Sequence, residues 1–176
     1  LGSQPGKRSR GLLPLAALAG EAIAAADFAA FNLVCAGREG GWILEAEDGR
    51  TVRRALPEGL SMLTAHGLDS AGSPPARLHL PRFRAAAPPD PGRGDWSSWL
   101  KLLASTEAEP GAGPRGAMTI EPVDGYGTVS ASLFALPADG GPAVWRFAAG
   151  PPGSAPFRPV ALASPAGAWP SPLPCP

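Results

Sequence analysis

The first third of the chain alternates between apolar runs and turn residues. Apolar positions recur at helical spacing over residues 11–27, which predicts a helix with one broad apolar face. Two short apolar runs, 31–36 and 42–46, flank a glycine turn and are typical of a β-hairpin. A second tight-turn signal, Asp48-Gly49, leads into a further expected strand over 51–54. This part of the chain is therefore predicted to be a helix followed by hairpin-connected strands.

The remainder of the chain continues this pattern with longer loops. A helix is expected over 96–105 behind the N-cap candidate Asp95, and a short one over 77–83, where Pro81 is expected to interrupt it. Further strands are expected over the ranges 59–65, 117–120, 128–136 and 143–148. Strands joined by tight turns favour antiparallel sheets with helices on their faces, so the predicted fold class is α+β.

Glycine and proline, at 23 residues each, gather between these elements and toward the end of the chain. The segment 151–176 is rich in both and is predicted to be a tail without regular structure. Residues 1–150 suit one domain that is large enough to bury a core. The high content of alanine, glycine, proline and arginine also fits a GC-rich bacterial genome.

The charge balance excludes some classes of partner. Lys+Arg and Asp+Glu both number 15, so neither a nucleic-acid footprint nor a polybasic membrane patch is expected. The longest apolar stretch, 12–30, is broken by Pro14 and by acidic residues and is too weakly apolar for a membrane span. Cys35 and Cys175 form no disulfide framework, so we expect a reduced, cytoplasmic protein.

The residues that could carry chemistry are scattered along the chain. No zinc spacing and no phosphate-loop motif occurs, so no metal or cofactor is expected. His66, Asp69 and a serine could be combined into a catalytic triad, but no nucleophile elbow accompanies them. His66 is more simply a strand-end residue. The cationic run Lys7-Arg8-Ser9-Arg10 is either a solvated loop or a clamp for an anion.

Four stretches, in their order along the chain, resemble the NRDE family, that of Transport and Golgi organisation protein 2. The family has a Ser-Arg-Gly before a Leu-rich helix, a Phe-Asn-Leu strand, a Gly-led Leu-Ser segment and a Tyr-Gly-Thr-x-Ser strand. The matching stretches are Lys7-Arg8-Ser9-Arg10-Gly11, Phe31-Asn32-Leu33-Val34, Pro57-Glu58-Gly59-Leu60-Ser61-Met62-Leu63 and Gly125-Tyr126-Gly127-Thr128-Val129-Ser130-Ala131-Ser132. The similarity covers about residues 5–148.

The resemblance implies an N-terminal-nucleophile hydrolase-like fold, an αββα sandwich of antiparallel sheets. The family's nucleophile is expected to be a cysteine directly after the initiator methionine, followed by an Asn-Arg-Asp-Glu motif, and this sequence contains neither. Cys35 lies in an expected strand and Leu1 carries no nucleophile, so no catalytic residue is assigned. We therefore expect residues 1–150 to be a partial NRDE-type domain, incomplete at its N-terminus, from a fragment or a late-start gene model.

The resemblance leaves several functions open. One is amide-bond hydrolysis by a longer form of the protein. Another is non-enzymatic handling of a small molecule, haem or a lipid or acyl-coenzyme A, with His66 and His79 as generic haem ligands. A third is a fragment without function. The matched polar positions are the candidate ligand-positioning residues, namely Ser9, Arg10, Asn32, Thr128 and Ser130.

Overall fold

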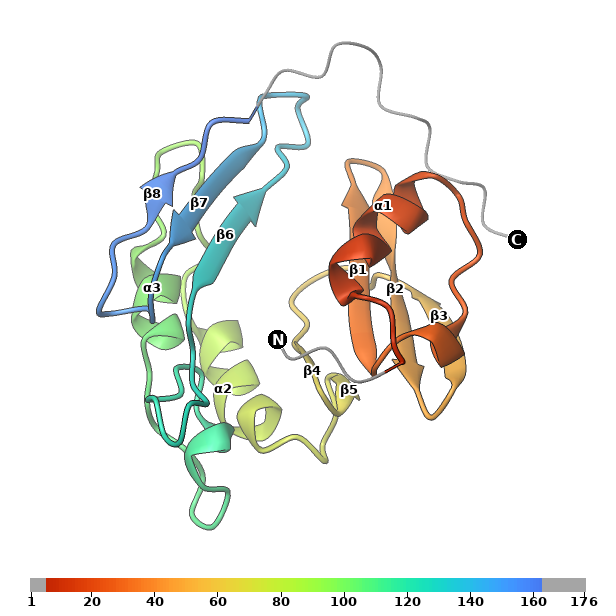
Figure 1. The fold of residues 1–176 in the computed structure, drawn as a ribbon. Coiled ribbons are helices and arrows are strands. Elements are labelled where there is room, and N and C mark those ends of the chain that lie inside the picture. The colour runs from red at the N-terminus through yellow and green to blue at the C-terminus, as the bar shows by residue number, and fades with distance from the viewer. Residues whose placement is uncertain (1–5, 163–176) are drawn as a thin grey trace. The chain divides into compact units, whose positions relative to one another are not determined.

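The computed structural model describes residues 6–162, without the side chain of Glu47. Within this range the chain divides into two compact units, residues 6–58 and 59–162 (Figure 1). Each unit combines short helices with antiparallel strands, so the predicted α+β class is confirmed at this level. No helix in the described range has the length and apolar character needed to cross a bilayer.

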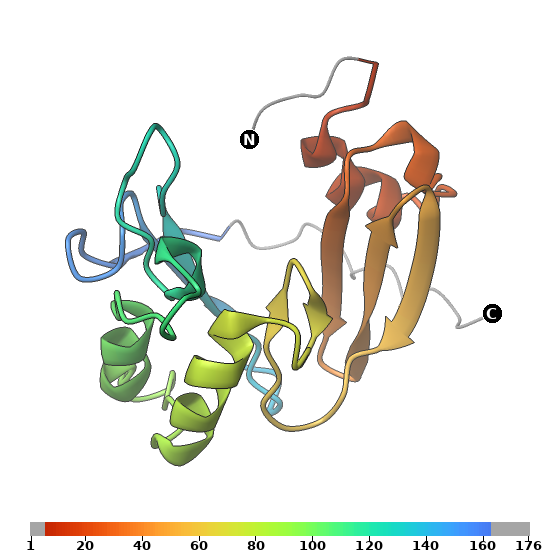
Figure 2. The same cartoon turned by 90° about the horizontal axis from the view of Figure 1, so that it is seen from below.

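The first unit is a three-stranded antiparallel sheet in the order β1-β2-β3, with helical turns before it. Its elements are η1 (Arg10–Leu12), α1 (Leu13–Leu18), η2 (Ala25–Asp27), β1 (Phe31–Gly37), β2 (Gly40–Glu47) and β3 (Arg50–Ala55). Figure 2 shows the three strands side by side as one twisted sheet. The hairpin predicted at Asp48-Gly49 is confirmed, because both residues have positive φ, 49° and 75°, as a tight two-residue turn requires.

The core of the first unit lies on one face of this sheet. The register places Phe31 opposite Ala46 and Leu33 opposite Leu44, so these four side chains share a face. They pack with apolar residues from the segment that precedes β1, namely Leu13, Ile23, Ala25 and Phe28. The predicted strands therefore occupy the expected positions, and α1 covers one face of the sheet (Figure 1).

The helix predicted over 11–27 is wrong beyond its first turns. α1 ends at Leu18, and Gly20 follows with a φ of 70°. The amide of Gly20 donates to the carbonyl of Ala17, and the amide of Glu21 donates to the carbonyl of Ala16. This pair of bonds is a Schellman motif, which terminates a helix at a left-handed glycine. The alanines that follow Gly20 continue the apolar pattern but not the helix.

The second unit contains two short antiparallel sheets and two α-helices. Its elements are β4 (Leu63–Thr64), β5 (Gly67–Leu68), α2 (Pro74–Ala85), α3 (Ser97–Leu103), η3 (Pro114–Gly116), β6 (Ala131–Ala135), β7 (Val144–Ala148) and β8 (Arg158–Pro159). β4 pairs with β5, and the second sheet has the order β6-β7-β8. β8 corrects the expectation that no regular structure follows residue 150, while residues 163–176 of the predicted tail lie outside the described range.

α2 is longer than the predicted helix and passes through Pro81. It begins after Ser73, whose buried hydroxyl accepts a hydrogen bond from the amide of Ala76. Pro74 occupies the first helical position, where the absence of an amide hydrogen has no cost. Pro81 removes one bond inside the helix, but its side chain is exposed, and the buried residues Leu80 and Phe83 on either side hold the helix together.

Three of the predicted strands in this unit are shorter than expected or absent. Residues 117–120 form no strand, because the hydroxyl of Thr119 donates to the carbonyl of Leu103 at 2.7 Å and its amide to that of Ser105 at 2.9 Å. Of the range 128–136 only β6 is a strand, and of 59–65 only β4. These segments satisfy their backbone groups through loops and helix ends instead of a ladder.

The two faces of the β6-β7-β8 sheet differ in burial. Leu133 and Ala148, on one face, are 5% and 0% exposed. Phe134 lies opposite Trp145 on the other face, and it is 55% exposed. The indole nitrogen of Trp145 donates to the hydroxyl of Ser132 at 3.3 Å on this same face. The sheet therefore buries one face and leaves an aromatic face partly open.

Candidate functional site

The cationic run 7–10 is tied to the segment that precedes β1. The ammonium of Lys7 donates to the carbonyl of Ala26 at 2.5 Å, and the Arg10 guanidinium donates to the carbonyl of Ala30 at 2.9 Å. Arg8 lies over the ring of Phe28, 5.2 Å from its centroid. These contacts hold the start of the described chain against 26–30, so part of the donor capacity of the run is already used.

The matched polar residues of the first unit have local contacts. The Ser9 hydroxyl accepts from the amide of Gly11 at 3.3 Å and caps η1. Asn32 lies in β1 opposite Glu45, on the face of the sheet away from Phe31 and Leu33. Ser9 and Arg10 thus have structural contacts, and Asn32 presents an exposed side chain.

The matched polar residues of the second unit lie just before β6. The Thr128 hydroxyl accepts from the amide of Ile120 at 2.9 Å, and the Thr128 amide donates to the Ile120 carbonyl at 2.9 Å. Ser130 is exposed and directly precedes Ala131, the first residue of β6. The structure brings Thr128 and Ser130 to one strand entry in the second unit, while Ser9, Arg10 and Asn32 belong to the first unit.

The residues considered for a triad do not form one. His66 is exposed at the β4–β5 turn, where its amide donates to the Thr64 hydroxyl at 3.2 Å. The Asp69 carboxylate accepts from the amide of Met62 at 2.6 Å and lies 3.7 Å from the guanidinium of Arg84. Asp69 therefore closes the β4–β5 hairpin instead of orienting a histidine. No cluster of three or more His, Cys, Asp or Glu side chains within residues 6–162 is placed to hold a metal.

Cys35 lacks the surroundings of a reactive thiol. It is half-buried in β1, opposite Trp42, whose ring is covered by the Arg53 guanidinium at 4.6 Å. Burial raises the pKa of Cys35, and the positive charge of Arg53 opposes this only in part. A thiol with a raised pKa carries little thiolate at neutral pH, so Cys35 is a poor nucleophile.

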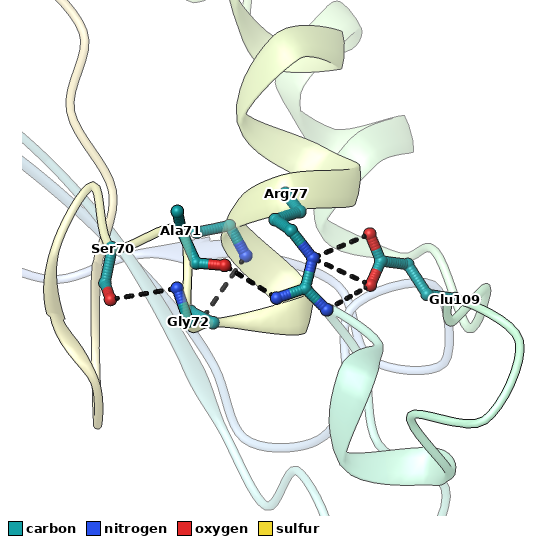
Figure 3. Close-up of polar contacts among 7 residues, drawn as sticks. Ser70, Ala71, Gly72, Arg77 and Glu109 are labelled. Atoms are coloured by element: carbon teal, nitrogen blue, oxygen red, sulfur yellow. Dashed lines mark hydrogen bonds and ion pairs between the residues drawn. The ribbon is translucent and has the colours of Figure 1, made fainter.

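Two ion pairs and a buried histidine fasten α2 to residues 107–109. Arg77 donates to both carboxylate oxygens of Glu109, and also to the carbonyl of Ala71 at 2.7 Å (Figure 3). Arg82 pairs with the carboxylate of Glu107. His79 is completely buried, with Nε2 3.1 Å from the Glu107 carbonyl oxygen, so it is not open to a haem iron. These contacts hold α2 against the segment 107–109.

An apolar hollow lies at the β7–β8 edge of the second unit, with a volume of about 410 Å³. Phe147, Ala149, Pro156 and Val160 contribute apolar walls, and Arg158 is the one charged residue in its lining. This volume falls within the range of about 300–1,000 Å³ typical of small-molecule sites. No His, Cys or Met lines the hollow, so its residues do not fit a haem.

Sequence reasoning missed the hollow because residues 151–162 were assigned to a tail. The one available signal was the isolated Arg158 between Phe157 and Pro159 in an otherwise apolar stretch. Pro152 pairs with Ala155 in an isolated bridge, which turns the chain back so that β8 reaches β7. A tight turn in a proline-rich stretch can thus create a site that composition alone does not indicate.

Comparison with known proteins identifies no family for this chain. No protein-family model matches it, and neither a curated protein nor a solved structure matches it.

Proposed function

We propose that the chain forms part of an NRDE-type domain with an N-terminal-nucleophile hydrolase-like architecture. The order of the resembling stretches supports this, since each precedes or opens a structural element. Ser9-Arg10-Gly11 leads into α1, Phe31 opens β1, and Tyr126-Gly127-Thr128 precedes β6. Antiparallel sheets with helices at their faces are compatible with this architecture. The layered sandwich itself is part of the proposal.

Within such a domain, we propose that these residues contribute binding surface rather than the nucleophile. The observation that supports this is the state of Cys35, which is half-buried in a strand with its pKa raised by burial. A hydrolase of this class needs a nucleophile whose own α-amino group acts as the base, which a cysteine inside a strand cannot provide.

The hydrolase part of the proposal can be tested on protein isolated from the cells that naturally produce it. We would measure its intact mass and sequence its N-terminus. An N-terminal cysteine, together with a mass above 17.8 kDa, would support the hydrolase function. A mass equal to that of these 176 residues would contradict it and leave binding as the function.

A second proposed function, non-enzymatic binding of a lipid-like ligand, is favoured by the apolar hollow beside Arg158. Its walls suit a hydrocarbon, and its single cation suits an acidic head group. Decanoate, added below its micellar concentration, should raise the unfolding temperature of the full chain in a saturable way. An unfolding temperature that does not change over the whole range of decanoate concentration would contradict this function.

A further inference from the structure

We propose that Arg158 anchors the oxyanion head of a single-chain apolar ligand whose tail lies in the hollow at the β7–β8 edge. This rests on the proposed binding function and adds to it a specific residue, a specific face of the sheet and a class of head group. The head group is a carboxylate or a phosphate, since both present paired oxygens that match the planar fork of a guanidinium.

The sheet register places the anchor beside the apolar wall. Arg158 lies opposite Phe147 in the β7–β8 pair, so both side chains project from the same face. The amide of Val160 donates to the carbonyl of Trp145 at 2.9 Å, so the β7–β8 pairing continues as far as these two residues. Val160 therefore lies on the same face of the sheet as Arg158 and Phe147. Arg158 therefore lies at the border between solvent and an apolar surface formed by Phe147 and Val160.

Arg158 has no acidic partner in the part of the chain that the structure describes. Among residues 6–162, no carboxylate lies within ion-pair distance of it, whereas Arg54, Arg77, Arg82 and Arg84 each pair with an acid. An arginine beside an apolar surface gains more from an anion than an arginine in open solvent does, because the surface lowers the local dielectric. A ligand with an acidic head and an apolar body satisfies both the cation and the hollow.

Arg146 provides a control for charge within the same sheet, although it is half-buried opposite Leu133 whereas Arg158 is exposed. It lies one position from Phe147 in β7 and opposite Pro159, so it projects from the other face. It is also without a carboxylate partner in the described range and does not line the hollow. Arg146→Gln and Arg158→Gln therefore change the net charge equally but only one of them alters the proposed site.

The experiment is calorimetric titration of the full chain with decanoate, decyl phosphate and decanol. We expect both anions to bind and Arg158→Gln to weaken them about tenfold, the effect of losing one charge-assisted contact. Arg158→Lys should retain part of the affinity, and Arg146→Gln should leave it unchanged. Decanol should bind more weakly than decanoate and show no dependence on Arg158. Circular dichroism of each variant checks that it is folded.

A further variant tests the location of the tail. Ala149 is exposed and lines the hollow, so Ala149→Leu should fill part of it without disturbing the core. We expect this variant to weaken decanoate and decanol alike. Equal losses in Arg158→Gln and Arg146→Gln would overturn the anchor while leaving the binding function intact. Failure of every ligand to bind the unchanged protein would overturn the binding function itself.

Discussion

The Nε2 atom of His79 lies 3.1 Å from the backbone carbonyl oxygen of Glu107, and the imidazole that makes this contact is completely buried. Its other nitrogen, Nδ1, is also buried and has no hydrogen-bond partner. The Gly116 backbone favours a proton on the ring, but it makes no hydrogen bond to Nδ1. Burial is the larger effect, so the site favours the neutral ring over the charged one.

This geometry predicts that acid destabilises the second unit. Burial lowers the pKa of His79 and nearby Arg82 lowers it further, whereas the Glu107 carbonyl and carboxylate and the Gly116 backbone oppose the shift. The unfolded chain then binds more protons than the folded chain, so stability falls as the pH drops below about 6.5. The fall ends once the pH is below the lowered pKa of the folded state.

Urea unfolding measured between pH 7 and pH 5 checks this prediction. His79→Gln keeps an amide donor for the Glu107 carbonyl and leaves every carboxylate in place, so only the histidine titration is removed. The variant should lose less stability than the unchanged protein over this pH range. Parallel stability curves for the two proteins would show that His79 does not titrate as proposed.

The contact between Arg77 and Glu109 predicts a moderate loss of stability in Arg77→Ala. The guanidinium donates to both oxygens of Glu109 and to the Ala71 carbonyl, but the pair is partly exposed (Figure 3). Partly screened pairs are weak, so we expect a loss of about 1 kcal/mol in the free energy of unfolding. Arg93→Ala, at an exposed turn, is the control and should change it by less than about 0.5 kcal/mol. Equal effects would contradict the anchoring role of Arg77.

The strands of the first unit were predictable because their signals are local. Asp48-Gly49 follows the apolar run 42–46 and marks a tight turn into 51–54 without reference to the rest of the chain. The helix ending at Leu18 was missed although Gly20 was visible, since a long alanine-rich pattern outweighed a single glycine. Pro81 had the opposite effect on the prediction, because it suggested a break in a helix that in fact continues. Burial of Leu80 and Phe83 stabilises α2 despite the hydrogen bond that Pro81 removes. The helix propensity of a local sequence contains no information about such tertiary packing.

The candidate site was less predictable than the fold. Ser9, Arg10 and Thr128 were singled out as polar positions, and each of their side chains bonds to a backbone group within its own unit. Whether a polar side chain is used locally depends on where the chain turns, which the sequence does not state. Arg158 was the reverse case, because its lack of an acidic partner emerges only when the positions of all described carboxylates are known.

The unequal faces of the β6-β7-β8 sheet predict opposite results for two adjacent residues. Leu133 is 5% exposed and Phe134 is 55% exposed. Leu133→Ala should reduce the free energy of unfolding by about 3 kcal/mol, because it removes buried methyl groups and leaves a cavity. Phe134→Ala should cost less than about 1 kcal/mol, because most of its ring already contacts water. Urea unfolding of both variants checks this, and a larger loss for Phe134→Ala would show that the aromatic face is covered.

The surroundings of Cys35 predict a slow thiol whose reactivity depends on Arg53. Burial raises the Cys35 pKa and Arg53 lowers it, so Arg53→Gln should raise that pKa further and slow reaction with DTNB at neutral pH. The measurement uses protein that carries Cys175→Ser, so that Cys35 is the only thiol that can react. The rate of its reaction with DTNB is followed as the pH rises. In the unchanged protein the rate should still be rising at a pH where an exposed thiol has levelled off.

Arg54→Gln is the matched control, because Arg54 pairs with Glu45 from the opposite face of β3. A rate that levels off near neutral pH would mean that Cys35 is an activated thiol, which would remove the main argument against a nucleophile within these residues.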